Sequence, residues 1–294
     1  MSVVLGPNNY GKSEVRLVKV DRGADRHELR DLTVDVALSG EFEPAHVRGD
    51  NTGLLATDTM RNTVYALARK HPVDSPESFA IALVKHFLDA GPSVTRAQVR
   101  IVEHPWARLG SHPHSFQRAS GGRHVATVTG DGTDLAVEAG IDDLLVLKTT
   151  GSGWEGYLHE QYTSLKETAD RIMSTVVTAR WNYRDAQVDF GPIWEAVRAT
   201  ILDAFGDHYS PSVQFTLYRM GEAVLDAHPE VERIHFSLPN KHHLLYDLSR
   251  FGLDNPNEIF HATTEPYGLI EGTVERSPAP VERAGGAGLG AARA

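Results

Sequence analysis

The 294-residue sequence contains no cysteine. This absence excludes disulfides, thiolate nucleophiles, cysteine-ligated zinc and iron–sulfur clusters. No run approaches the roughly 20 consecutive apolar residues that span a bilayer, and residues 1–11 lack the basic and apolar regions of a signal peptide. We therefore expect a cytoplasmic protein with no membrane partner.

Positive charge is also in short supply. The 29 Lys and Arg residues are outnumbered by 39 Asp and Glu residues, so the formal net charge is −10. A protein that coats nucleic acid needs surplus positive charge to neutralise phosphates, so no nucleic-acid partner is expected. The composition, 41% hydrophobic and 23% charged, is typical of a globular protein with a sizeable core, and the length allows two domains.

Hydrophobic periodicity predicts the same succession of elements in both halves of the chain. The first half is expected to contain strands over 14–20 and 32–42, helices over about 54–68 and 75–91, and strands over 98–106 and 115–129. The second half is expected to contain strands over 144–149 and 172–181, a helix over about 193–205, a helix opening at Ser210-Pro211, and strands over 232–238 and 264–273.

These elements predict an α+β fold of two tandem ββααββ units, with antiparallel sheets and helices on one face. The first unit is expected at residues 1–138 and the second at residues 139–276. Residues 277–294 are rich in Pro, Gly and Ala and carry almost no large apolar side chain. A segment of that composition cannot form a core, so we expect it to be a disordered tail.

The sequence carries no clear cofactor motif. Its 15 histidines suggest a metal site, with His104, His112 and His114 or with His242 and His243 as ligands. Neighbouring strand residues point to opposite faces, so the last two cannot easily share an ion, and solvated or hydrogen-bonded histidines are the better interpretation. Glycine-rich phosphate loops, the dinucleotide fingerprint and the G-x-S-x-G elbow are absent. We expect neither a metal nor another cofactor.

Four short polar segments lie beside apolar runs, at 10–12, 56–59, 162–175 and 238–242. Each has a purely structural explanation. Lys12 suits a surface position, and Thr57 with Asp58 suits the polar first turn of a helix. Arg171 suits a solvated charge set, and Asn240 suits a strand end. Spacing alone favours these explanations and leaves the function open.

Taken together, the segments resemble the urate oxidases, or uricases, from Tyr10 to about Glu275. Five motifs follow the order and spacing of that family: YGK from Tyr10, GDNTGLLATDTMRNTVYALA from Gly49, YTSLKETADRIMST from Tyr162, SPSVQ from Ser210 and LPNKHH from Leu238. The resemblance implies the tunnelling fold, in which tandem ββααββ units of a homotetramer assemble into a barrel.

The resemblance also implies a cofactor-free oxidase that converts urate, O2 and water to 5-hydroxyisourate and hydrogen peroxide. The electron-rich urate anion itself reduces O2, and the protein deprotonates and orients the purine. Lys12, Thr57 and His242 match the proton relay of the family; a shielded lysine loses its charge more readily, and a histidine titrates near working pH. In the family, Thr57 and Asp58 also contact the substrate and come from a neighbouring subunit, so the site requires the oligomer.

The remaining substrate-binding positions follow from the same resemblance. Arg171 and Gln214 match the residues that hold the purine edge, where a guanidinium suits an anionic oxygen and an amide both donates and accepts. Backbone groups of Val213 and Asp58 are expected to add hydrogen bonds. Asn240 is expected to hold O2 or water above the ring.

Two features depart from the family pattern. The residue that stacks on the purine is usually Phe, and Trp154 matches it here; an indole stacks at least as well, so we expect an effect on affinity rather than on the reaction. Tyr157 is the less suitable stacking residue. The chain ends Ala-Ala-Arg-Ala, where eukaryotic members carry a peroxisomal Ser-Lys-Leu-type signal, and together with the composition this favours a bacterial cytoplasmic enzyme.

The main alternative is a tunnelling-fold relative that binds a purine or pterin without oxidising urate. Such a protein would need a different acid–base set or would keep only the substrate-holding residues. The relay and the substrate-holding set are both intact in this sequence, which favours the urate oxidase.

Overall fold

A computed structural model describes residues 2–277 of the chain. The elements are, in chain order, β1 (Tyr10–Arg22), β2 (His27–Gly40), α1 (Glu43–Arg48), α2 (Thr57–Lys70), α3 (Pro76–Ala90), β3 (Val94–Glu103), β4 (Trp106–Arg108), β5 (Phe116–Arg118), β6 (Arg123–Gly130), β7 (Leu135–Lys148), β8 (Met173–Tyr183), α4 (Phe190–Gly206), α5 (Val213–Ala227), β9 (Val231–Leu245), the 3₁₀ turn η1 (Ser249–Phe251) and β10 (Phe260–Glu275).

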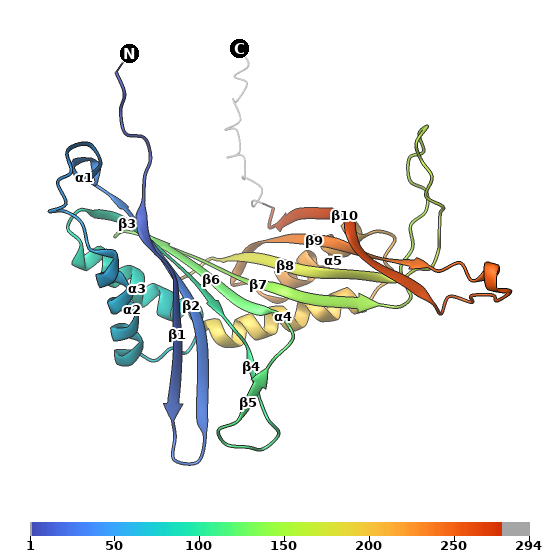
Figure 1. Ribbon diagram of the computed structural model, residues 1–294, viewed down its shortest axis with the longest axis horizontal. Coiled ribbons are helices and arrows are strands. Elements are labelled where there is room, and N and C mark those ends of the chain that lie inside the picture. The colour runs from blue at the N-terminus through green and yellow to red at the C-terminus, as the bar shows by residue number, and fades with distance from the viewer. Residues whose placement is uncertain (1, 278–294) are drawn as a thin grey trace, which may run out of the picture.

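One long antiparallel sheet organises the molecule. Its strands follow the order β1-β2-β3-β6-β7-β8-β9-β10, and β4 with β5 forms a separate small ladder. The helices α2 and α3 lie along the first half of the sheet and α4 with α5 along the second half, all on the same face (Figure 1). The predicted α+β class, with antiparallel strands and helices on one face, is therefore confirmed.

The order ββααββ occurs twice, as β1-β2-α2-α3-β3-β6 and then as β7-β8-α4-α5-β9-β10. The last strand of the first unit pairs with the first strand of the second, from Arg123 opposite Asp142 to Gly130 opposite Leu135, so the sheet is continuous. The expected division at residues 138 and 139 lies inside β7, and the two units stay a prediction as domains. The expected tail lies, apart from Ser277, outside the described residues.

Several predicted bounds were wrong. The strand expected over 115–129 is split into β5 and β6, and β7 begins nine residues before the expected start at Leu144. The elements α1 and β4 were not predicted, because they are six and three residues long and too short to display a period.

The apolar periodicity accounts for the core between the sheet and the helices. On β2, the four alternating residues Leu32, Val34, Val36 and Leu38 are at most 2% exposed, as alternation predicts. On α3, Phe79, Leu83 and Phe87 are equally buried, at a spacing of four. Each such side chain contributes about 1.5–3 kcal/mol to folding by leaving water. The apolar core runs without interruption across both repeats.

The starts of α3 and α5 show how polar residues set the helix bounds. At α3, Ser75 caps the helix by accepting a hydrogen bond from the Ser78 amide at 3.1 Å, as predicted. The start expected for α5 at Ser210-Pro211 was wrong, because α5 begins at Val213 with Ser212 as its cap. Ser210 instead contacts a neighbouring loop, since its amide donates to the Gly151 carbonyl at 2.8 Å.

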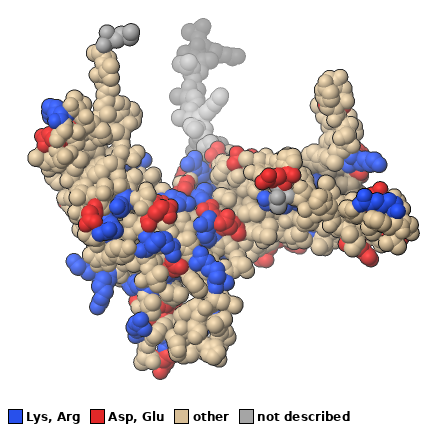
Figure 2. All heavy atoms as spheres, in the orientation of Figure 1, with Lys and Arg blue, Asp and Glu red and all other residues tan. Residues whose placement is uncertain are grey.

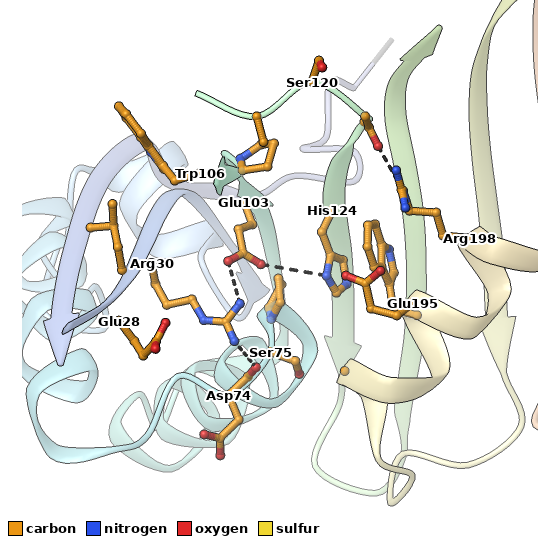
Figure 3. A pocket seen from close by; sticks show the side chains of 18 residues that line it. Glu28, Arg30, Asp74, Ser75, Glu103, Trp106, Ser120, His124, Glu195 and Arg198 are labelled. Carbon is orange, nitrogen blue, oxygen red and sulfur yellow. Dashed lines mark hydrogen bonds and ion pairs between the residues drawn. The ribbon is translucent and has the colours of Figure 1, made fainter. Parts of the chain in front are cut away.

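A hollow of about 640 Å³ lies where the two repeats meet, between the start of α3 and α4 (Figure 3). Its polar wall carries Arg30, whose Nη1 lies 2.7 Å from Oε1 of Glu103. Behind it, Nε2 of His124 lies 2.7 Å from Oε1 of the fully buried Glu77, and the His124 ring stacks on Trp194. None of the expected site residues lines this hollow. Its two ion pairs lie within the first repeat, and the stacking of His124 on Trp194 joins the repeats.

The surface carries charges of both signs. On the face shown in Figure 2, acidic and basic side chains are interspersed rather than gathered by sign. Among the helices of residues 2–277, none is long and apolar enough to cross a membrane.

Candidate active site

Three of the expected site residues lie where α2 begins beside the edge strand β1. The Tyr10 hydroxyl on β1 accepts a hydrogen bond from the Leu55 amide at 2.9 Å, which ties the start of α2 to this strand. Lys12 follows Tyr10 by two residues, and Thr57 follows Leu55 by two. The structure therefore places Lys12, Thr57 and Asp58 in one region.

The start of α2 offers unused backbone donors. The helix begins at Thr57 after Ala56, and no side chain caps it. Thr57 and Asp58 occupy the first turn of this helix, as predicted, but within residues 2–277 their side chains do not cap its amides; Asp58 pairs with Arg61, at 2.6 Å. The first amides of a helix have no acceptor within it and carry the positive end of its dipole. Because Thr57 and Asp58 are exposed, this helix start can hold an anion.

The other expected residues lie around the start of α5, where three loop segments are joined by backbone contacts. Ser152 pairs with Ser210, and Trp154 pairs with Thr168. The Arg171 amide donates to the Ser152 carbonyl at 2.8 Å. These contacts bring together three segments: the one that carries Trp154, the one that carries Arg171, and the one that leads into α5.

Arg171 and Trp154 form the centre of this cluster. Cζ of Arg171 lies 5.8 Å from the centre of the Trp154 ring, and Trp154 stacks on Tyr157 at 5.4 Å with an angle of 15° between the rings. Burial lowers the pKa of Arg171, but an arginine starts so far above neutrality that it stays charged. Its Nε is buried and has no hydrogen-bond partner within residues 2–277. A half-buried cation with an unused donor, beside an aromatic plane, suits a flat anion.

The strand β9 adds two polar side chains to the same side of the sheet. Leu238, Asn240 and His242 alternate along the strand and so share one face. Leu238 is fully buried in the core between the sheet and the helices. Asn240 and His242 therefore lie on the same, helix-facing side of the sheet, farther along the strand. Val213 and Gln214 occupy the first turn of α5, and Ser212 caps the Phe215 amide rather than theirs.

The structure thus divides the expected site residues into two groups. One group comprises Lys12, Thr57 and Asp58, and the other comprises Trp154, Arg171, Val213, Gln214, Asn240 and His242. From β1 to β9 the sheet order contains six steps between neighbouring strands. At roughly 4.8 Å a step, the strands carrying Lys12 and His242 lie about 30 Å apart along the sheet. One chain therefore does not bring the two groups together (Figure 1).

His104, one of the histidines considered as a metal ligand, has other partners. Nε2 of His104 lies 2.8 Å from the Thr33 hydroxyl, and its Nδ1 lies 3.0 Å from Nη2 of Arg118. Among residues 2–277, no group of three or more metal-ligating side chains is placed to hold an ion.

Three buried hydroxyls beside the Trp154 cluster were not singled out from the sequence. Ser152, Thr175 and Ser210 are at most 2% exposed. Thr175 lies directly opposite Asn240 in the β8–β9 ladder, and neither Thr175 nor Ser152 has a side-chain partner in the described part of the chain. Thr175 and Ser210 belong to the motifs from Tyr162 and Ser210, so membership of those motifs is the signal that could have identified them.

Comparisons with known proteins agree with this arrangement. The family model described as Uricase matches residues 8–129 and 137–271. The chain is 48% identical to a uricase from Arthrobacter globiformis over 93% of this chain and 90% of that protein, and 42% identical to one from Dictyostelium discoideum over 92% and 96%.

The crystal structure of the Arthrobacter globiformis uricase superposes with a TM-score of 0.92 over 97% of this chain and 99% of that one, at 46% identity. The resemblance found in the sequence and the tunnelling fold of the chain are both confirmed, whereas the barrel assembled in a homotetramer stays a prediction. The chain belongs to the uricase family.

Proposed function

We propose that the protein is a urate oxidase that converts urate, O2 and water to 5-hydroxyisourate and hydrogen peroxide. The observation that carries this proposal is the meeting of a half-buried guanidinium whose Nε has no partner within residues 2–277, an aromatic plane and a helix start in one loop cluster. A planar purine anion needs these three features. The 48% identity to a uricase over 93% of the chain gives independent support.

In this proposal the cluster around α5 holds the purine. The Arg171 guanidinium donates to an anionic oxygen and a ring nitrogen of the purine. The Gln214 side-chain amide forms hydrogen bonds with the neighbouring edge of the same ring. The Val213 amide, free at the start of α5, adds a hydrogen bond that the helix dipole strengthens. Trp154 packs against the ring plane. The ring is thereby fixed, so that only its reacting face remains accessible.

The relay residues then move protons while the substrate supplies the electrons. The urate anion transfers two electrons to O2, which takes up two protons and leaves as hydrogen peroxide, and the oxygen of water bonds to the oxidised ring. Lys12 accepts a proton through the Thr57 hydroxyl, and His242 passes it onward. Asn240 holds O2 or water over the ring. No metal or flavin takes part in this scheme.

The complete site requires at least two copies of the chain, because the Lys12 group and the His242 group lie near opposite edges of the sheet. Both edge strands, β1 and β10, have a side with no partner strand among residues 2–277, and such edges invite pairing. Apolar side chains near β10 are half exposed, including Leu244, Leu245 and Leu269. We infer that copies meet at these edges to close a barrel in a homotetramer. The cytoplasmic location remains a prediction.

The first test is turnover of urate. Purified, dialysed protein is incubated with urate in air with excess chelator, and urate absorbance and hydrogen peroxide are followed. We expect rapid loss of urate with one peroxide formed per urate, because the substrate itself reduces O2. Binding of urate without turnover would instead favour the purine- or pterin-binding relative, and loss of activity with chelator would contradict the cofactor-free scheme.

The second test is complementation between two inactive chains, Lys12→Met and His242→Ala. Each pure variant is expected to be inactive, whereas a mixed assembly contains sites with Lys12 from one chain and His242 from the other. Random mixing of equal amounts should restore about one quarter of wild-type activity, since half of the interfaces are mixed and half of their sites are intact. The two variants are co-expressed with different tags, and the doubly tagged assembly is assayed. No recovery in that assembly would show that one chain supplies the whole relay.

A further inference from the structure

A chain of polar contacts leads from the end of α4 into the start of α5. Nδ1 of His208 lies 2.8 Å from the Ala204 carbonyl oxygen, and its Nε2 lies 2.9 Å from Oγ1 of Thr216. Oγ1 of Thr216 lies 2.7 Å from Oγ of Ser210, which in turn lies 2.9 Å from the Ser212 carbonyl oxygen. Thr216 and Ser210 are at most 1% exposed, so water cannot readily replace these contacts.

The direction of the first contacts follows from the chemistry of the groups. The Ala204 carbonyl only accepts, so Nδ1 of His208 carries a hydrogen. Burial is the largest cause that lowers the pKa of His208, and Lys148 and Arg219 lower it further, while the hydrogen bond to the Ala204 carbonyl and Asp207 oppose them; the net lowering favours the neutral ring. Nε2 is then an acceptor, and the Thr216 hydroxyl donates to it. The Thr216 oxygen is left to accept from the Ser210 hydroxyl, whose single hydrogen serves either Thr216 or the Ser212 carbonyl. Ser210, within reach of both Thr216 and the Ser212 carbonyl, connects the histidine to the residue that caps α5.

Ser210 is also the backbone link to the loop that carries the stacking residue. Its amide donates to the Gly151 carbonyl, and its carbonyl accepts from the Gly153 amide, both at 2.8 Å. Trp154 follows directly after Gly153. On the other side, Ser212 caps the Phe215 amide at 3.1 Å and so fixes where α5 starts. The position of Ser210 therefore sets the aromatic plane and the helix start relative to each other.

We propose that Thr216 and His208 are positioning residues for urate, acting through Ser210 to keep the Gln214 end of α5 in register with Trp154. This inference rests on the proposed function. Neither residue belongs to the substrate-holding set. Without their contacts, Gln214, which binds the edge of the purine, and Trp154, which packs on its face, can shift independently. Displacements of about 1 Å are enough to weaken a positioned contact severely. The relay residue Lys12 lies near the opposite edge of the sheet, so substrate binding is affected more than the chemical step.

The test compares Thr216→Val, which keeps the shape and removes the hydroxyl, with Thr216→Ser, which keeps the hydroxyl. We expect Thr216→Val to raise KM for urate about tenfold and to change kcat less than about twofold, with Thr216→Ser close to wild type. Urate binding without O2, measured by calorimetry, should weaken by the same factor. His208→Phe removes the contact from the other end and should give the same result if Thr216→Val does not fold.

Thr200→Val is the matched control. Oγ1 of Thr200 lies 2.9 Å from Nε2 of His228, so the variant removes a similar threonine–histidine contact between α4 and the residue that follows α5, at the other end of that helix. We expect it to leave KM and kcat unchanged. An unchanged KM in both Thr216→Val and His208→Phe, or an equal rise in Thr200→Val, would overturn the positioning role even if wild type oxidises urate. A wild-type protein that binds no urate would overturn the proposed function itself and this inference with it.

Discussion

Replacing Lys12 with methionine is expected to lower kcat for urate by about 10²–10⁴-fold, the usual contribution of a positioned proton-transfer group, while urate still binds. The substrate-holding residues lie around α5, far along the sheet from β1, so they are left intact. Methionine has a similar length and no ionisable group, so the loss concerns proton transfer. Stopped-flow kinetics of urate loss, with calorimetric urate binding in the absence of O2, separates the two effects.

Two further variants show whether the lysine acts by its charge or by its proton. Lys12→Arg keeps a positive charge that cannot be given up near neutrality, so it should be almost as inactive as Lys12→Met. Lys19→Met is the matched control, since Lys19 lies on the same strand and donates to the His71 carbonyl at 2.9 Å. It should keep wild-type kcat. Full turnover in Lys12→Met would remove Lys12 from the relay, and full turnover in Lys12→Arg would leave it only an electrostatic role.

The sequence predicted best the elements with one buried face. Leu32 to Leu38 alternate because β2 buries one side under α3, and Ser75-Pro76 marks a helix start because its chemistry is local. The start of β7 was missed because residues 135–143 mix Gly140, Asp142 and Asp143 with apolar residues. β9 was expected to end at Leu238 because its continuation, Pro239 to Leu245, carries the polar residues of the site. The pairing of β6 with β7 depends on contacts between units, which no local pattern contains.

The site residues could be listed from the motifs but not arranged from them. The resemblance implied that Thr57 and Asp58 come from another subunit, whereas the placement of Lys12 in the same group follows only from the contact between Tyr10 and Leu55. The role of Ser210 was also hidden. It was expected to open a helix, and its hydroxyl and backbone instead connect the start of α5 to the loop at residues 151–153, which is distant in the sequence.

Replacing Arg171 with alanine is expected to raise the Kd for urate about a hundredfold, or by about 2.8 kcal/mol, because one charged group then no longer donates to the anion. The guanidinium is half-buried, and its Nε has no other partner within residues 2–277, so no other hydrogen bond competes for that donor. Trp154 would remain, and stacking alone would orient the ring poorly. Calorimetry without O2 gives the Kd directly, and kcat/KM should fall at least as far.

The geometry of the donors, rather than charge alone, should determine this affinity. Arg171→Lys keeps the charge but loses the planar fork, so it should recover only part of the binding. Arg198→Ala is the matched control, because Arg198 donates to the Gly121 carbonyl at the hollow between the repeats and touches none of the substrate-holding set. It should bind urate as wild type does. Unaltered binding in Arg171→Ala would remove Arg171 from the site, and full recovery in Arg171→Lys would show that the cation acts as a point charge. Since Lys12→Met is expected to spare binding and Arg171→Ala to weaken it, the pair tests whether holding the purine and moving its protons belong to separate groups of residues.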